Sequence, residues 1–157
     1  MLAALLLAVV GGAALLALWW RASVEEREVD RLVRRLIDLA VRDPAEALRL
    51  LREHPELRSA RTVHDATPLH FCALEGQPEG VRFFADAGVP LDAVNDLGDT
   101  ALVDAVAQGN VEVAKLLLRK GADPDAVSPL RGSALGIAQG QGNAALVALL
   151  RDAGARG

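Results

Sequence analysis

The chain has 157 residues, a formal net charge of −4 and one cysteine; 52% of its residues are apolar, but only 3% are aromatic. The length favours one domain rather than two, and the negative charge argues against nucleic-acid binding, which needs a basic surface. The single cysteine, Cys72, excludes an intramolecular disulfide and a multi-cysteine metal site.

Residues 1–21 are predicted to form a transmembrane anchor. The 19 residues from Leu2 to Trp20 include no charged side chain, and a helix of that length spans about 28 Å, close to the ~30 Å hydrocarbon core of a bilayer. A cleaved secretory signal is the alternative; the absence of Lys or Arg before the apolar run and of a small-residue cleavage site before Arg21 weakens it. Residues 22–32 are interpreted as a juxtamembrane helix or linker.

The charges beside the anchor predict its orientation in the inner (plasma) membrane. Only the α-amino group precedes the apolar run, whereas several arginines follow it: Arg21, Arg27, Arg31, Arg34 and Arg35. The positive-inside rule therefore favours a single-pass protein with a cytoplasmic domain. A periplasmic domain is the alternative, because short N-terminal anchors also deliver such domains. Ala4, Ala8 and Gly12 have the spacing that lets two helices pack closely, so homo-oligomerisation through the anchor is a further possible role.

A repeat with a period of 33 residues organises the chain from residue 33 onwards. Repeats of this length are typical of stacked supersecondary units. The units are predicted to be 33–66, 67–99, 100–132 and 133–157, with the first and last acting as caps. The columns in phase are Thr67, Thr100 and Ser133; Leu36, Leu69, Leu102 and Leu135; Cys72, Ala105 and Ala138; Gly76, Gly109 and Gly142; Leu51, Phe84, Leu117 and Leu150; and Gly88, Gly121 and Gly154.

Each column has a physical role in a helix–turn–helix unit. A Thr or Ser hydroxyl at a helix start accepts a hydrogen bond from an unpaired backbone N–H, and Pro68 suits the first helical position. Small residues such as Cys72 and Ala105 permit close helix packing. Glycine after the last turn supplies the positive φ of a helix end. The stretches 89–99 and 122–132, rich in Asp, Asn, Pro and Gly, are predicted to project as turns.

These motifs resemble the ankyrin repeat family. The stretch DTALVDAVAQGNVEVAKLLLRKGADPDAV, residues 99–127, matches the family's helix–turn–helix–hairpin pattern, and Thr67–Pro68–Leu69–His70 reproduces its hallmark tetrapeptide. The resemblance covers about residues 30–157 and implies an all-α ankyrin-repeat solenoid, preceded here by the transmembrane helix. Val103 and Gly136 replace the His of the tetrapeptide in later units, and the first unit lacks the Thr and the Gly.

The resemblance implies structural rather than catalytic roles for His70 and Cys72. In the family, the His and Thr of the tetrapeptide bind adjacent turns, and a small buried residue occupies the position of Cys72. A Cys72–His70 nucleophile pair is the enzymatic alternative. His64, Asp65, His70 and Glu75 are the only grouping with metal-ligand chemistry, and no metal-binding or phosphate-binding motif accompanies them. We therefore predict no catalytic residue, no cofactor and no metal.

The family's usual contact positions predict a partner-binding groove on the concave side of the stack. Its residues are Arg61, Val63, His64, Ala66, Leu74, Glu75, Val94, Asp96, Leu97, Asp99, Ala107, Gln108, Val127, Pro129, Leu130 and Gln141. Leu74, Leu97 and Leu130 would form an apolar stripe flanked by acidic residues. Residues 62–157 hold seven basic and twelve acidic residues, a net charge of −5, so the predicted partner has a basic and apolar surface.

The sequence thus predicts a non-catalytic, bacterial-type ankyrin scaffold that is held at the membrane and docks a membrane-associated protein. The tether would raise the effective concentration of that partner. A periplasm-facing domain that scaffolds or protects an envelope enzyme is the alternative.

Overall fold

The fold is described for residues 28–62 and 64–156 by a computed structural model. The predicted anchor, residues 1–21, lies outside these residues, as does most of the segment 22–32. Among the helices of the described part, none combines the length and the apolar composition needed to cross a membrane.

The first unit consists of two helices and a short 3-10 turn. Residues 28–42 are helical, without a break at the predicted boundary between residues 32 and 33. The helix α2 (Pro44–Glu53) follows at once and leads to the turn η1 (Pro55–Arg58). Asp43 starts α2: its Oδ1 accepts a hydrogen bond from the backbone N–H of Glu46 at 3.1 Å, and Pro44 occupies the first helical position. Asp43 and Pro44 therefore take over the roles of the Thr and Gly that this unit lacks.

Three helix pairs follow, one for each later unit. They are α3 (Pro68–Leu74) with α4 (Pro78–Asp86), α5 (Ala101–Ala107) with α6 (Val111–Lys120), and α7 (Ala134–Gly140) with α8 (Ala144–Asp152). Gly109 ends the first helix of the central pair with a φ of 73°, and Gly121 ends the second with a φ of 100°. Both angles lie in the left-handed region that glycine adopts without steric cost.

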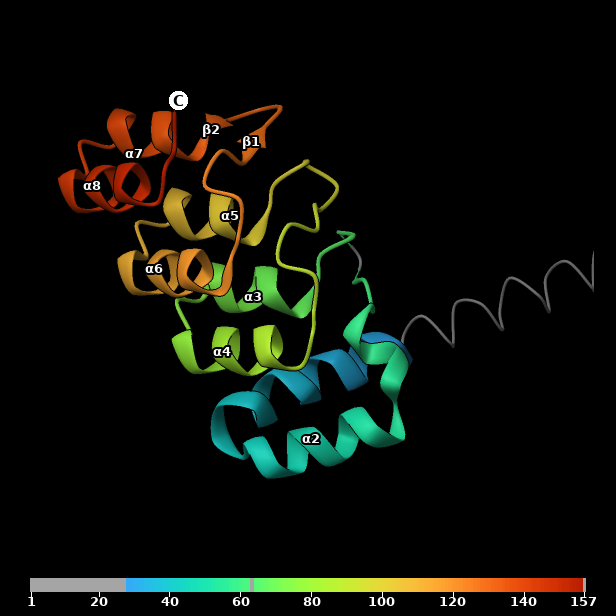
Figure 1. Cartoon of the computed structure of the whole chain (residues 1–157). Helices are drawn as coiled ribbons and strands as arrows, with labels where there is room; N and C mark the ends of the chain where they lie inside the picture. The colour runs from blue at the N-terminus through green and yellow to red at the C-terminus, as the bar shows by residue number, and fades with distance from the viewer. Residues whose placement is uncertain (1–27, 63, 157) are drawn as a thin grey trace, which may run out of the picture.

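Equivalent helices of successive units stack in two columns (Figure 1). The inner column packs α3 against α5 and α5 against α7, while the outer column packs α4 against α6 and α6 against α8. The helix starts Thr67, Thr100 and Ser133 accordingly occupy the N-cap of each inner helix in turn. The 33-residue period is therefore the period of the stack.

The turns between units project away from the helices (Figure 1). The turn before α5 is closed by an isolated bridge between Val94 and Thr100. The turn before α7 forms a short antiparallel pair, β1 (Val127–Ser128) with β2 (Gly132–Ser133), in which Val127 pairs with Ser133. These turns carry most of the predicted contact residues.

One apolar core runs through all four units. Leu36, Leu69, Leu102 and Leu135 are buried in the inner column, and Leu51, Phe84, Leu117 and Leu150 are buried in the outer column. Each of these sets is one column of the 33-residue repeat. The predicted capping units therefore contribute to the same core as the central ones.

The closest helix approach in the second unit depends on Gly80 in α4. A Cβ added there would lie 2.6 Å from the Sγ of Cys72 in α3, whereas a Cβ at Gly140 in α7 would meet nothing within 4 Å. We expect Gly80→Ala to lower the free energy of unfolding by about 1–3 kcal/mol through overpacking. Gly140→Ala is the matched control and should stabilise by up to about 1 kcal/mol through helix propensity. Equal effects of the two changes in chemical denaturation would contradict this packing.

Candidate functional site

Most of the predicted contact residues lie at the surface, on the projecting turns and the ends of the inner helices. Val63 lies outside the described residues. Ala107 is half-buried, and Ala66 and Asp99 are buried, with 6% and 0% exposure. Ala66 and Asp99 therefore offer a partner no surface in this conformation, and we leave them out of the contact face. The exposed members are Arg61, His64, Leu74, Glu75, Val94, Asp96, Leu97, Gln108, Val127, Pro129, Leu130 and Gln141.

Five large apolar side chains are exposed on this face, which we call the turn face. Leu74 ends α3 with 38% exposure, Val94 and Leu97 lie on the next turn with 46% and 43%, and Val127 and Leu130 lie on the β1–β2 turn with 60% and 74%. Exposed apolar groups that gather on one side of a protein often mark an interaction site. The turn face is therefore the first candidate for a partner-binding surface.

Hydrogen bonds tie the projecting turns of successive units to one another. Arg61 Nη1 donates to the backbone oxygens of Asp65 and Val94, both at 2.7 Å. The backbone N–H of Asp96 donates to the backbone oxygen of His64 at 3.0 Å, and the side chains of these two residues approach to 3.3 Å. The structure thus brings together Arg61 with Val94 and His64 with Asp96, pairs that the sequence placed in different layers. These bonds hold the turn face in one arrangement before any partner arrives.

A further link joins the ends of two inner helices. Gln141 Nε2 donates to the backbone oxygen of Ala107 at 2.8 Å. Two more predicted contact residues, from α5 and the end of α7, are therefore in direct contact with each other.

His70 is a buried structural link between two units. Its Nδ1 accepts from the backbone N–H of Thr67 at 3.1 Å and lies 2.8 Å from the Thr67 hydroxyl, while its Nε2 donates to the backbone oxygen of Asp99 at 2.9 Å. These partners fix the neutral tautomer with the proton on Nε2. Burial lowers the pKa of His70, and the nearby charge of Arg61 lowers it further. His70 therefore joins the start of α3 to the turn before α5, as the family resemblance implies.

Cys72 lies in the core and is not prepared for nucleophilic chemistry. Its side chain is buried, and burial raises the pKa of its thiol to about 12. The thiolate is the reactive species of cysteine, and it is scarce at neutral pH when the pKa is this high. Both ring nitrogens of His70 are already engaged with Thr67 and Asp99, so neither is free to take the thiol proton. Within the described residues, no group of three or more His, Cys, Asp or Glu side chains is arranged to hold a metal ion.

The sequence analysis missed a buried acidic pair in the central unit. Asp99, just before α5, and Asp104, within α5, are 0% and 2% exposed. Arg131 from the β1–β2 turn lies over both: its Nε is 3.4 Å from Asp99 Oδ2, and its Nη1 is 3.7 Å from Asp104 Oδ1. The signal was present as a carboxylate within ALVDAVA, a helix that is otherwise apolar, but the repeat alignment did not score it.

Burial raises the pKa of Asp104 from its ordinary value of 3.8 to about 6, and the charge of Asp99 raises it further while Arg131 lowers it. The folded chain therefore holds the Asp104 proton more tightly than the unfolded chain. Below pH 3.8 both states are protonated; as the pH rises from 3.8 through about 6, the fold loses stability.

We expect Asp104→Asn, which removes this charge, to raise the free energy of unfolding by about 1–3 kcal/mol at pH 7.5. The gain should shrink towards zero by pH 4. Asp96→Asn, at the surface, is the control and should change stability by less than about 0.5 kcal/mol at both pH values. Denaturant titrations at the two pH values measure the difference; a gain at pH 4 as large as at pH 7.5 would contradict the assignment.

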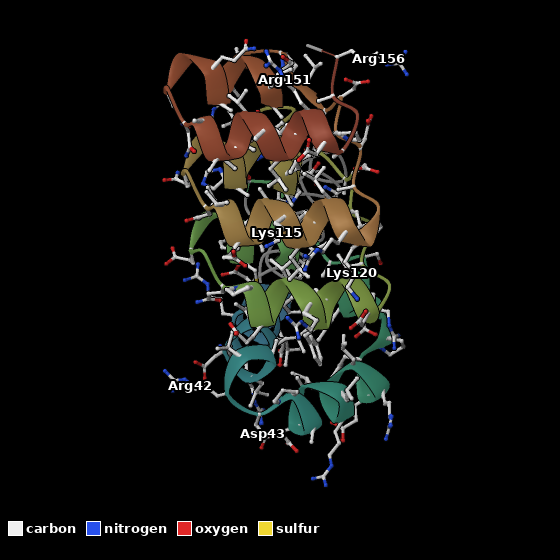
Figure 2. The ribbon with its side chains drawn as sticks, turned by 60° about the vertical axis from the view of Figure 1, so that its left-hand side comes forward. Arg42, Asp43, Lys115, Lys120, Arg151 and Arg156 are labelled. Atoms are coloured by element: carbon white, nitrogen blue, oxygen red, sulfur yellow. The ribbon has the colours of Figure 1, made fainter. Side chains whose placement is uncertain are left out.

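A second hollow lies on the side of the outer helices. It has a volume of about 430 Å³ and lies between the first unit and α4, where Val41 and Leu48 are 37% and 43% exposed. Its lining consists of Ala40, Val41, Pro44, Leu48, Glu79, Arg82, Phe83, Asp86 and Ala87. The rest of the outer side carries charged groups, including Lys115 and Lys120 on α6 and Arg151 on α8 (Figure 2). The repeat alignment did not predict this hollow, because it involves the atypical first unit.

The described part is a right-angled succession of helix pairs and projecting turns, the architecture of a helical-repeat solenoid. A family model described as "Ankyrin repeats (3 copies)" matches residues 36–128, more than half of the chain, so the chain belongs to the ankyrin repeat family. Members of this family generally act as non-catalytic protein–protein interaction modules.

The chain also resembles solved structures. An ankyrin repeat domain from Acinetobacter baumannii AYE, solved by crystallography, superposes with a TM-score of 0.68 at 28% sequence identity; the match covers 77% of the present chain and 64% of the Acinetobacter chain. No curated protein matches the sequence significantly. The described chain thus spans under two thirds of the length of that structural relative.

Proposed function

We propose that the chain is a membrane-tethered scaffold that binds a membrane-associated protein through the turn face. The observation that carries this proposal is the gathering of Leu74, Val94, Leu97, Val127 and Leu130, each more than a third exposed, on three successive layers. Apolar groups of this size bury about 1.5–3 kcal/mol each when a partner covers them. The hydrogen bonds between the turns support the proposal further, because a preorganised surface spends less conformational entropy on binding.

Charge favours a partner with basic groups beside its apolar ones. Asp65, Glu75 and Asp96 are exposed beside the apolar residues of the turn face. Opposite charges on two surfaces mainly accelerate their encounter. When the full-length chain is used to capture proteins from solubilised membranes, the association rate of the captured protein should fall as salt is raised. Association kinetics that do not depend on salt would remove this electrostatic part of the proposal.

The tether and the cytoplasmic placement rest on the sequence of residues 1–35. The uncharged apolar run and the arginines that follow it favour an inner-membrane anchor with residues 28–157 in the cytoplasm. A topology reporter fused after Gly157 tests this placement. We expect a cytoplasmic signal and a protein that stays with the membrane after alkaline carbonate extraction. A periplasmic signal, or release of the chain into the soluble fraction, would overturn the side or the tether respectively.

A further inference from the structure

The buried acidic pair occupies positions at which the neighbouring units carry uncharged residues. The positions 33 residues before Asp99 and Asp104 hold Ala66 and Phe71, and the positions 33 residues after them hold Gly132 and Ile137. Two carboxylates therefore replace small and apolar residues in one layer only. Burial of a carboxylate costs several kcal/mol unless hydrogen bonds or an opposite charge offset it. The packing of the repeat does not account for this pair.

The pair is incompletely satisfied within the chain. Both side-chain oxygens of Asp99, and Oδ2 of Asp104, are buried without a hydrogen-bond partner. One guanidinium, that of Arg131, faces the two carboxylates at 3.4 and 3.7 Å. These distances exceed those of charge-assisted hydrogen bonds, about 2.7–2.9 Å. The site is therefore built around a guanidinium but binds the one it has loosely.

Arg131 lies at the edge of the turn face, where its side chain is 37% exposed. The turn that carries it is fixed at its base: Ser128 Oγ accepts from the backbone N–H of Arg131 at 3.1 Å, and Pro129 packs against Gly98, where an added Cβ would lie 2.7 Å from the proline ring. The next residue along, Leu130, is 74% exposed. The side chain of Arg131 can thus swing into solvent without unfolding the turn.

Resting on the partner-binding role proposed above, we propose that Asp99 and Asp104 form the recognition site for an arginine side chain of the partner protein, and that Arg131 occupies this site in the free chain. The partner's guanidinium displaces Arg131 and places its planar fork of donors against the unpartnered carboxylate oxygens. Apolar residues beside that arginine cover Leu97 and Leu130. Arg131 is then an internal competitor that must be released before the partner binds.

A peptide tests this site without any cellular partner. The probe is the acetylated, amidated tripeptide Leu-Arg-Leu, and its control contains citrulline, which is isosteric with arginine but uncharged. Calorimetry with the full-length chain in detergent micelles measures binding to the wild type, to Arg131→Ala and to the double variant Arg131→Ala/Asp104→Asn. Arg131→Gln, which keeps the length of the side chain, replaces Arg131→Ala if circular dichroism shows that the latter is unfolded.

We expect the arginine peptide to bind Arg131→Ala at least about tenfold more tightly than the wild type, because removal of a competitor raises the fraction of chains that can bind. The double variant should lose this gain, and the citrulline peptide should bind none of the three. An arginine peptide that binds Arg131→Ala no more tightly than the wild type would overturn the proposal, as would equal binding of the citrulline peptide. Either result would leave the turn face as a partner surface untouched, since capture of a membrane protein through Leu97 and Leu130 is measured separately.

Discussion

The double variant Leu97→Asp/Leu130→Asp is expected to capture at least about a hundredfold less partner from solubilised membranes than the wild-type chain. Each leucine is substantially exposed in the free chain, at 43% and 74%. Burying a leucine contributes about 1.5–3 kcal/mol, and every 1.4 kcal/mol changes affinity about tenfold. Two carboxylates that must be desolvated at an apolar contact add to the loss.

Leu48→Asp is the matched control for this variant. Leu48 is 43% exposed, as Leu97 is, but it lines the hollow beside α4 rather than the turn face. We expect Leu48→Asp to leave capture unchanged and all variants to unfold at similar denaturant concentrations. If Leu48→Asp abolished capture and the double variant did not, the partner would bind the outer hollow instead.

His70→Ala is expected to lower the free energy of unfolding by about 2–5 kcal/mol, because it removes buried hydrogen bonds and leaves a cavity. The change would strip the backbone oxygen of Asp99 and the backbone N–H of Thr67 of their partner at once. His64→Ala is the control: that side chain is 77% exposed and faces only Asp96. It should cost less than about 0.5 kcal/mol in the same denaturant titration.

The effect of His70→Ala should also depend on pH. The fold lowers the pKa of His70 through burial, so it favours the neutral ring, and the stability that the ring provides is present above its ordinary pKa of 6.5. As the pH falls below that value, the unfolded chain takes up a proton first and the wild type loses stability. The difference between the wild type and His70→Ala should therefore shrink from pH 7.5 to pH 5. A difference that grows over this range would show that the folded state holds a charged His70.

The sequence predicts the stack well because a fixed period constrains every layer at once. Thr100 and Ser133 cap their helices as predicted: Thr100 Oγ1 accepts from the backbone N–H of Val103 at 3.3 Å, and Ser133 Oγ accepts from that of Gly136 at 3.0 Å. The anchor, the domain boundaries and the side of the membrane stay predictions.

The sequence predicts the binding face less completely, because position in a repeat does not give the depth of a side chain. Asp99 aligns with surface positions of the family but is turned inward, where its main chain meets His70 and its carboxylate meets Arg131. Arg131 reaches the acidic pair from a turn about thirty residues away, and such a contact leaves no periodic trace. The hollow beside α4 is invisible for a related reason: only one repeat unit borders the irregular first unit.

Site-specific photo-crosslinking in intact membranes tests most directly whether the chain binds a protein through the turn face. A photoreactive amino acid is placed at Leu97 on the turn face or, as the control, at Lys115 on α6 of the outer side. We predict a discrete crosslinked protein from position 97 and none from position 115. Crosslinks from position 115 alone, or no protein adduct from position 97 while the chain is folded and in the membrane, would contradict a scaffold that binds through its turns.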